Sequence, residues 1–132
     1  MKKLYLLSGK ARSGKDTIAN IIKDYYESIG KKVVITSFAK YIKMYAKEIT
    51  GWNGEEATKP RTLLQELGTE IVREKLGKEN IYALRMLDDI DIYNYFADVV
   101  IIKDVRFLHE LETIVGYVVH RIVVGDFLPL LQ

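Results

Sequence analysis

The segment Gly9-Lys10-Ala11-Arg12-Ser13-Gly14-Lys15 constrains the fold more than any other part of the chain, because it matches the pattern G-x-x-x-x-G-K. A short apolar run at residues 3–7 precedes it, and apolar residues at helical spacing follow it from Lys15 to about Ile29. A strand, a glycine-containing loop and a helix in this order place backbone N–H groups and a helix N-terminus around phosphate. The sequence therefore predicts a phosphate-binding loop, and the alternative of a turn without a ligand is disfavoured by the flanking strand and helix.

The residues that end this loop suggest how a nucleoside triphosphate and its metal are held. Lys15 is expected to reach the β- and γ-phosphates. Asp16 follows it where most such loops have a Ser or Thr whose hydroxyl binds Mg²⁺, and Thr17 comes next. Asp16 can bind Mg²⁺ directly or through water, or it can complement the helix dipole, and the sequence leaves both interpretations open. The candidate nucleotide-binding residues are Gly9, Lys10, Ala11, Arg12, Ser13, Gly14, Lys15, Asp16 and Thr17.

Strands and helices alternate along the remaining chain. Further strands are predicted at 33–38, 98–102 and 117–124. Helices are predicted after Phe38 with an end at Gly51, from Pro60 to about 76, at 79–89 and at 106–115. The strands are apolar without strict alternation, which predicts an α/β fold with a parallel sheet, flanking helices and right-handed crossovers. We expect a single domain over residues 1–132, in which residues 38–96 form a helical region inserted between the second and third strands.

Several aromatic and apolar side chains of the predicted helices are assigned to the core. On the helix after residue 38 the expected buried stripe consists of Ile42, Tyr45, Ala46 and Ile49. The tyrosines, among them Tyr25, Tyr41, Tyr45 and Tyr82, are also expected in the core rather than stacked on bases. Trp52 lies in a polar stretch and receives no role.

Composition excludes several classes of function. The 132 residues include 20 Lys and Arg against 18 Asp and Glu, and the basic pairs are too short to follow a nucleic acid backbone. The chain contains no cysteine, which suits a reducing compartment, and we expect a cytoplasmic protein. No apolar run approaches the roughly 18 residues that a membrane-spanning helix needs, so no membrane association is expected.

A second group of polar residues follows the strand predicted at 98–102. Asp104 and Arg106 come directly after it, at the edge of a parallel sheet where ligands bind. Asp104 is a candidate Mg²⁺ ligand, and its alternative role is to cap the next helix. The planar guanidinium of Arg106 can bind a phosphoryl group.

Taken together, three segments resemble the deoxynucleoside monophosphate kinases of bacteriophages and bacteria. The segments are Ser8 to Thr17 (SGKARSGKDT), Arg61 to Glu70 (RTLLQELGTE) and Asp104 to Glu110 (DVRFLHE), in the order and spacing of that family. The resemblance implies a P-loop fold of the nucleoside monophosphate kinase type, ATP and Mg²⁺ as cofactors, and transfer of phosphate to a (deoxy)nucleoside monophosphate. It covers residues 1 to about 124.

The resemblance also implies roles for individual residues. Lys15, Arg12, Asp16 and Arg106 become the candidate catalytic residues, and Asp16, Thr17 and Asp104 the candidate metal ligands. The acceptor would be bound by Lys43, Arg61, Gln65, Arg106 and Glu110. Without the resemblance, Arg61 and Gln65 would be assigned to a solvated helix surface.

The family pattern continues beyond the fourth strand into a lid segment with arginines, a fifth strand and a last helix, for which this sequence has no counterpart. This difference favours an alternative, a catalytically weak remnant that acts by nucleotide binding or assembly. Two further alternatives are a kinase of small molecules resembling animal phosphomevalonate kinases, which share the S-G-K-x-x-S-G-K-D start, and an NTPase acting on a macromolecule. Without a fifth strand, residues 117–124 are expected to form a sheet edge that supports a homo-oligomer.

Overall fold

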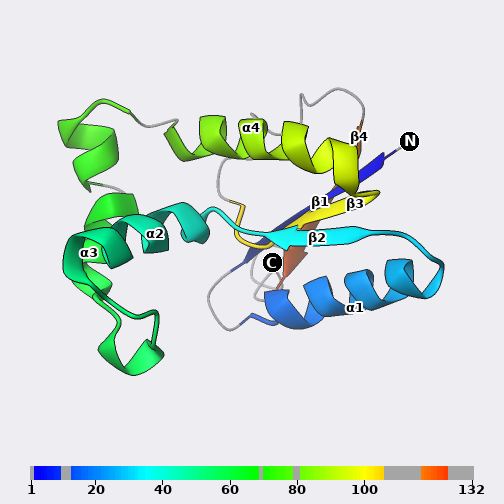
Figure 1. Ribbon diagram of the computed structural model, residues 1–132, viewed down its shortest axis with the longest axis horizontal. Coiled ribbons are helices and arrows are strands. Elements are labelled where there is room, and N and C mark those ends of the chain that lie inside the picture. Colours follow the sequence, from blue (N-terminus) through cyan, green and yellow to red (C-terminus); the bar gives the residue numbers. More distant parts are fainter. Residues whose placement is uncertain (1, 10–12, 69, 79–80, 106–116, 125–132) are drawn as a thin grey trace, which may run out of the picture. The chain divides into compact units, whose positions relative to one another are not determined.

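The computed structural model describes residues 2–9, 13–68, 70–78, 81–105 and 117–124 (Figure 1). Its elements in chain order are β1 (Lys2–Gly9), α1 (Lys15–Ser28), β2 (Val33–Thr36), α2 (Ala39–Thr50), the short 3₁₀ turn η1 (Glu56–Thr58), α3 (Arg61–Gly68), the π-helical segment η2 (Glu70–Lys75), α4 (Ile81–Phe96), β3 (Val99–Ile102) and β4 (Tyr117–Val124).

The four strands form one sheet in the order β2-β3-β1-β4, and every neighbouring pair is parallel. In the register of the sheet, Lys3 lies opposite Val99 of β3 and Val118 of β4. The predicted α/β fold with a parallel sheet and flanking helices is thereby confirmed. All strands run in the same direction, so their carboxyl ends share one edge, and the loop that follows β1 begins there.

The chain divides into two compact units. The first consists of Met1–Ser37 and Leu87–Gln132, and it contains the whole sheet and α1. The second consists of Phe38–Met86, and it contains α2, η1, α3, η2 and the first part of α4.

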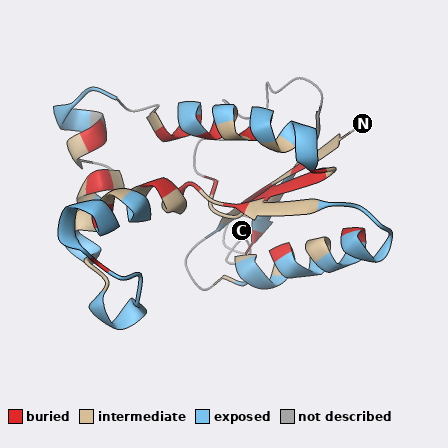
Figure 2. Ribbon diagram, viewed as in Figure 1, coloured by how far each residue is buried: buried red, intermediate tan, exposed pale blue. Residues whose placement is uncertain are grey.

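The central part of the sheet, β3 and the middle of β1, is buried on both faces. On one face Leu7, Val99 and Ile101 pack with Ala19 and Tyr26 of α1, and Figure 2 shows β3 entirely in the buried class. On the other face Leu4, Leu6, Val100 and Ile102 have no exposed surface. Because both faces are covered, the strands need no polar alternation, which explains their continuous apolar sequences.

The second unit has a small core of its own. Ala46 of α2, Leu67 of α3 and Trp52 of the connecting loop form a buried cluster, against which Ile42 and Tyr45 are packed. The indole Nε1 of Trp52 donates a hydrogen bond to the carbonyl oxygen of Glu55 at 2.9 Å. Trp52, which received no role from the sequence, is therefore a core residue whose polar atom is satisfied by its own loop.

Some expected core positions lie on the surface. Ile49 of α2 is 63% exposed and Tyr25 of α1 is 60% exposed, whereas Tyr41 and Tyr82 are buried as expected. Ile49 lies near the end of α2, one residue before Thr50, and the chain turns back at Gly51 with a φ of 73°. The cluster therefore uses Trp52, beyond the turn, and not Ile49.

Several predicted boundaries also differ. The helix expected at 60–76 ends as α3 at Gly68, where the Tyr82 hydroxyl donates to the carbonyl oxygen of Leu67 at 2.9 Å and satisfies a helix-terminal acceptor. A wider π-helical turn follows, in which the N–H of Leu76 donates to the carbonyl oxygen of Ile71.

Helix α4 extends to Phe96, beyond the predicted end at residue 89, and β2 ends at Thr36. The helix expected at 106–115 falls outside the described residues.

Within the described ranges, no helix combines the length and the apolar character needed to cross a membrane.

Candidate functional site

The glycines of the G-x-x-x-x-G-K segment have backbone conformations that other residues rarely adopt. Gly9 has a φ of 153° and Gly14 a φ of 96°. A Cβ atom at Gly9 would lie 2.2 Å from the carbonyl oxygen of Val124, the residue opposite Gly9 in the β1–β4 register. The backbone at both ends of this loop, residues 9–15, therefore requires glycine, as the phosphate-binding interpretation expects.

The side chain of Lys15 reaches back to Gly9, at the end of β1. Its Nζ donates a hydrogen bond to the carbonyl oxygen of Gly9 at 2.8 Å, although the two residues are six positions apart in sequence. Gly14 is the N-cap of α1, and among the described residues no side-chain cap is found at this helix start. The N–H groups of the first turn and the Lys15 ammonium group form the positive end of the helix.

A serine hydroxyl within the loop also lacks a partner. The Oγ atom of Ser13 is buried, and among the described residues it makes no hydrogen bond. A buried hydroxyl without a partner is unfavourable by about 1–3 kcal/mol, so such groups normally meet an acceptor. A phosphate oxygen is an acceptor that suits this position, so the described residues of the loop are compatible with a bound phosphate group.

Asp16 forms an ion pair with a residue that the sequence did not single out. The Nζ of Lys103, the first residue after β3, lies 2.9 Å from Oδ1 of Asp16, whose side chain is 81% exposed. Thr17, the next residue of α1, is also exposed. The first turn of α1 therefore lies beside the carboxyl end of β3, where a second acidic residue was expected.

Asp104 is placed at that edge by backbone hydrogen bonds on both sides of it. The N–H of Lys103 donates to the carbonyl oxygen of Thr36 at 3.0 Å, and the N–H of Val105 donates to that of Leu7 at 2.9 Å. Asp104 is half-buried between these two anchors, which fix the segment to the ends of β2 and β1. The structure thus brings Asp104, Lys103 and Asp16 to the same edge as the 9–15 loop.

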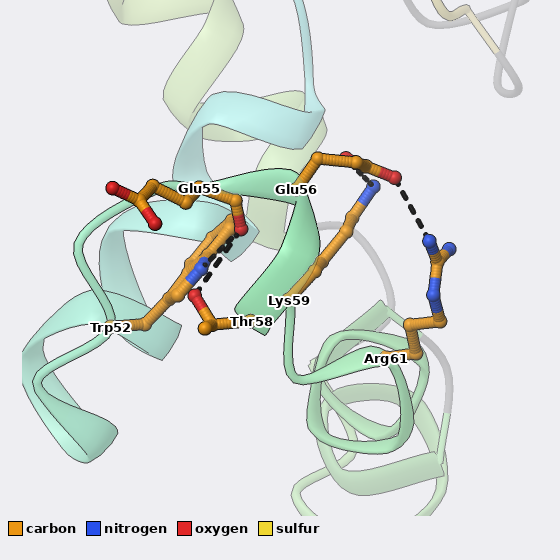
Figure 3. A network of polar contacts seen from close by, with 6 residues as sticks. All are labelled: Trp52, Glu55, Glu56, Thr58, Lys59 and Arg61. Carbon is orange, nitrogen blue, oxygen red and sulfur yellow. Dashed lines mark hydrogen bonds and ion pairs between the residues drawn. The ribbon is translucent and has the colours of Figure 1, made fainter.

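The predicted acceptor residues in the second unit lie on two helices. Lys43 is exposed on α2, and Arg61 and Gln65 are exposed one turn apart on α3. Arg61 donates from Nη2 to Oε1 of Glu56 at 2.9 Å, and Nζ of Lys59 lies 3.6 Å from the other carboxylate oxygen (Figure 3). The hydrogen bond from Arg61, followed by the charge of Lys59, lowers the pKa of Glu56. Arg61 therefore already holds an anionic group in this conformation.

Other predicted site residues, namely Lys10, Ala11, Arg12, Arg106 and Glu110, lie outside the described residues. The sequence did not point to Lys103, because its partner Asp16 is distant in the chain. It did not point to Glu56, because this residue lies in a loop without a recognisable motif. A signal for Lys103 was present, since a lysine directly after a buried strand lies at the ligand-binding edge of the sheet.

Comparison of the chain with models of known protein families and with curated proteins found no match.

Proposed function

We propose that the protein is a P-loop kinase of the nucleoside monophosphate kinase type, which transfers the γ-phosphoryl group of ATP to a (deoxy)nucleoside monophosphate. The observation that carries the proposal is the 9–15 loop, where two glycines with positive φ and Lys15 surround the N-terminus of α1 at the carboxyl edge of a parallel sheet. The order of the three sequence segments supports a nucleotide as acceptor.

The residues of the first unit would bind the donor. The N–H groups at the start of α1 and the Ser13 hydroxyl would donate to phosphate oxygens, and Lys15 would exchange its bond to Gly9 for one to the β- and γ-phosphates. When bound, Mg²⁺ compensates negative charge on the phosphates. Asp16, Thr17 and Asp104 are the residues available to hold it, directly or through water.

Transfer needs alignment rather than a general base. The phosphate of the acceptor has a second pKa of about 6, so it is largely ionised at neutral pH and can attack without losing a proton to the protein. One of its oxygens bonds to the γ-phosphorus while the bond to the β-γ bridging oxygen breaks, which gives ADP and a nucleoside diphosphate. Arg12, Arg106 and Lys15 would compensate the charge in this step.

The acceptor would be bound by Arg61, Gln65 and Lys43 of the second unit, with Arg106 and Glu110 of the third sequence segment. The hydrogen bond between Arg61 and Glu56 supports this role, because an N–H group that donates to a carboxylate oxygen can also donate to a phosphate oxygen. An acceptor phosphate would replace Glu56 as its partner.

The decisive experiment measures ADP release from ATP and Mg²⁺ with each of a panel of ribo- and deoxynucleoside monophosphates. We expect release that depends on at least one monophosphate, and its loss in Lys15→Ala with an unchanged melting curve. Lys23→Ala is the matched control, because Lys23 lies on the same helix and pairs only weakly with Glu27 at 3.5 Å on the surface. Wild-type turnover in Lys15→Ala would exclude the 9–15 loop from the mechanism.

The same assay separates the alternatives. Tight ATP binding without acceptor-dependent turnover would indicate the remnant, and release stimulated only by nucleic acid or another protein would indicate an NTPase. Activity with phosphomevalonate in place of nucleotides would indicate the small-molecule kinase. If the kinase is correct, Arg61→Ala and Arg106→Ala should raise the KM for the monophosphate more than that for ATP.

A further inference from the structure

The first unit contains a cavity at the end of the sheet opposite to the 9–15 loop. It has a volume of about 390 Å³ and is lined by residues at the starts of β1 and β3 and at the end of α1. The lining residues are Lys2, Lys3, Tyr25, Tyr26, Ile29, Lys31, Asp98 and Val99. Pockets for small molecules have volumes of about 300–1,000 Å³, so this cavity can hold a compact ligand. We call it the lysine–tyrosine pocket.

The charge of the lysine–tyrosine pocket is positive. Lys2, Lys3 and Lys31 contribute three ammonium groups, against the single carboxylate of Asp98. That carboxylate is already used in the fold, because its Oδ2 accepts the backbone N–H of Lys32 at 2.9 Å. Lys2 donates to the carbonyl oxygen of Ala97 at 2.6 Å, and an ammonium group has two further N–H donors. An anionic ligand therefore suits the pocket.

The wall formed by α1 is aromatic and held in place. The rings of Tyr25 and Tyr26 meet edge to face with centroids 5.1 Å apart, and Nζ of Lys3 lies 5.3 Å from the centroid of Tyr26. The hydroxyl of Tyr26 is hydrogen-bonded to that of Tyr5 at 2.5 Å, which fixes the ring from behind. Tyr25 remains 60% exposed and Ile29 53% exposed, so their apolar surfaces are available at the rim.

We propose that the lysine–tyrosine pocket is a second ligand site, which binds a small organic anion consisting of a phosphate-like group attached to a planar ring. The ammonium groups bind the anionic group, and Tyr25, Tyr26 and Ile29 provide apolar surface for the ring. A purely inorganic anion would leave this apolar wall unused. A neutral ring would leave the positive charge of the pocket without a matching anionic group.

The site is tested by nuclear magnetic resonance titration of the full chain with phenyl phosphate, inorganic phosphate and phenol as probes. We expect phenyl phosphate to shift the backbone signals of Lys3, Tyr26, Lys31 and Val99 saturably. Inorganic phosphate and phenol should each bind about tenfold more weakly, because each lacks one of the two groups that the pocket accommodates. Equal affinity for phenyl phosphate and inorganic phosphate would overturn the proposal in favour of a simple basic surface.

Variants then locate the binding. Lys31→Gln and Tyr25→Ala change exposed side chains of the pocket, and each should weaken the binding of phenyl phosphate about tenfold. Lys23→Gln, on the same helix but outside the lining, and Lys15→Ala, in the 9–15 loop, should leave the affinity unchanged. If Lys15→Ala abolishes the shifts, or if no saturable shift occurs at the pocket residues, the proposal is wrong. Neither result depends on whether the protein transfers phosphate.

Discussion

The ammonium group of Lys103, directly after β3, lies 2.9 Å from the carboxylate of Asp16 in the first turn of α1. Exposed ion pairs contribute only about 0–1 kcal/mol to stability, and the Asp16 side chain is 81% exposed. The pair is therefore better understood through its position beside the 9–15 loop. A carboxylate next to bound phosphates is repelled unless a cation lies nearby, and Lys103 provides one.

The first prediction concerns this ion pair. Lys103→Met should change the free energy of unfolding by less than about 1 kcal/mol. It should nevertheless weaken ATP binding in the presence of EDTA, because Asp16 loses this ammonium group. Adding Asp16→Asn to Lys103→Met should restore much of the affinity by removing the repelling charge. Isothermal titration calorimetry checks all three proteins, and unchanged affinity in Lys103→Met would contradict the prediction.

The second prediction concerns the backbone of Gly9. Gly9→Ala should lower the free energy of unfolding by about 3 kcal/mol or more, from strain at an unusual φ and from overpacking against Val124. Gly30→Ala is the matched control, because Gly30 has a φ of 82° but nothing within 4 Å of its Cβ position. It should lose only about 1–2 kcal/mol, from strain alone. Urea unfolding measures both, and equal losses would show that the contact with Val124 is unimportant.

The third prediction follows from the hydrogen bond between Arg61 and Glu56. Arg61→Ala should raise the pKa of Glu56 toward its ordinary value, since the bond from Arg61 is the largest cause that lowers it. A carboxyl group with a lowered pKa stabilises the fold above its ordinary pKa, and this contribution is lost as the pH falls through the lowered value. Carbon-detected titration of the Glu56 carboxyl group should show the change, with Lys23→Ala as a control that leaves it unaffected. An unchanged Glu56 titration in Arg61→Ala would mean that Lys59 alone maintains the shift.

Periodicity alone was enough to predict the parallel sheet and most helices. The continuous apolar sequences of β1 and β3 are typical of buried parallel strands. Gly9 and Gly14 stand where the loop pattern requires glycine, and both have a positive φ. The features that could not be predicted from the sequence depend on contacts between residues that are distant in the chain. Trp52 looks like a loop residue until α2 and α3 come together around it, and α3 ends where Tyr82 reaches the carbonyl of Leu67. In the site, Lys103 gains its role only when β3 lies beside α1.

The fourth prediction concerns β4, which is an edge strand of the described sheet and pairs only with β1 there. Val118 is 37% exposed and Val123 54% exposed, so the strand presents apolar side chains as well as an open edge. Edges of this kind favour pairing with another chain, and we expect a homo-oligomer that includes β4. Light scattering should give a mass above that of one chain, and Val123→Lys should reduce it. A monomer at micromolar concentration would rule out this contact.

The last prediction concerns Trp52, which anchors the second unit. Trp52→Ala should lower the free energy of unfolding by about 3–5 kcal/mol, because it empties the cluster between Ala46 and Leu67. Trp52→Phe should lose less, since a phenyl ring still fills part of the space of the indole, although the hydrogen bond to Glu55, worth about 1 kcal/mol, is removed. The matched control is Ile49→Ala on the neighbouring helix α2.

Ile49 is 63% exposed, so this control should stay within about 0.5 kcal/mol of the wild type. Unfolding is best followed by circular dichroism, because the only tryptophan of the chain is the residue being changed. A loss in Ile49→Ala as large as that in Trp52→Ala would mean that the outer stripe of α2 is buried after all. If the core of the second unit depends on the loop tryptophan, the loss of stability should be largest in Trp52→Ala, smaller in Trp52→Phe and smallest in Ile49→Ala.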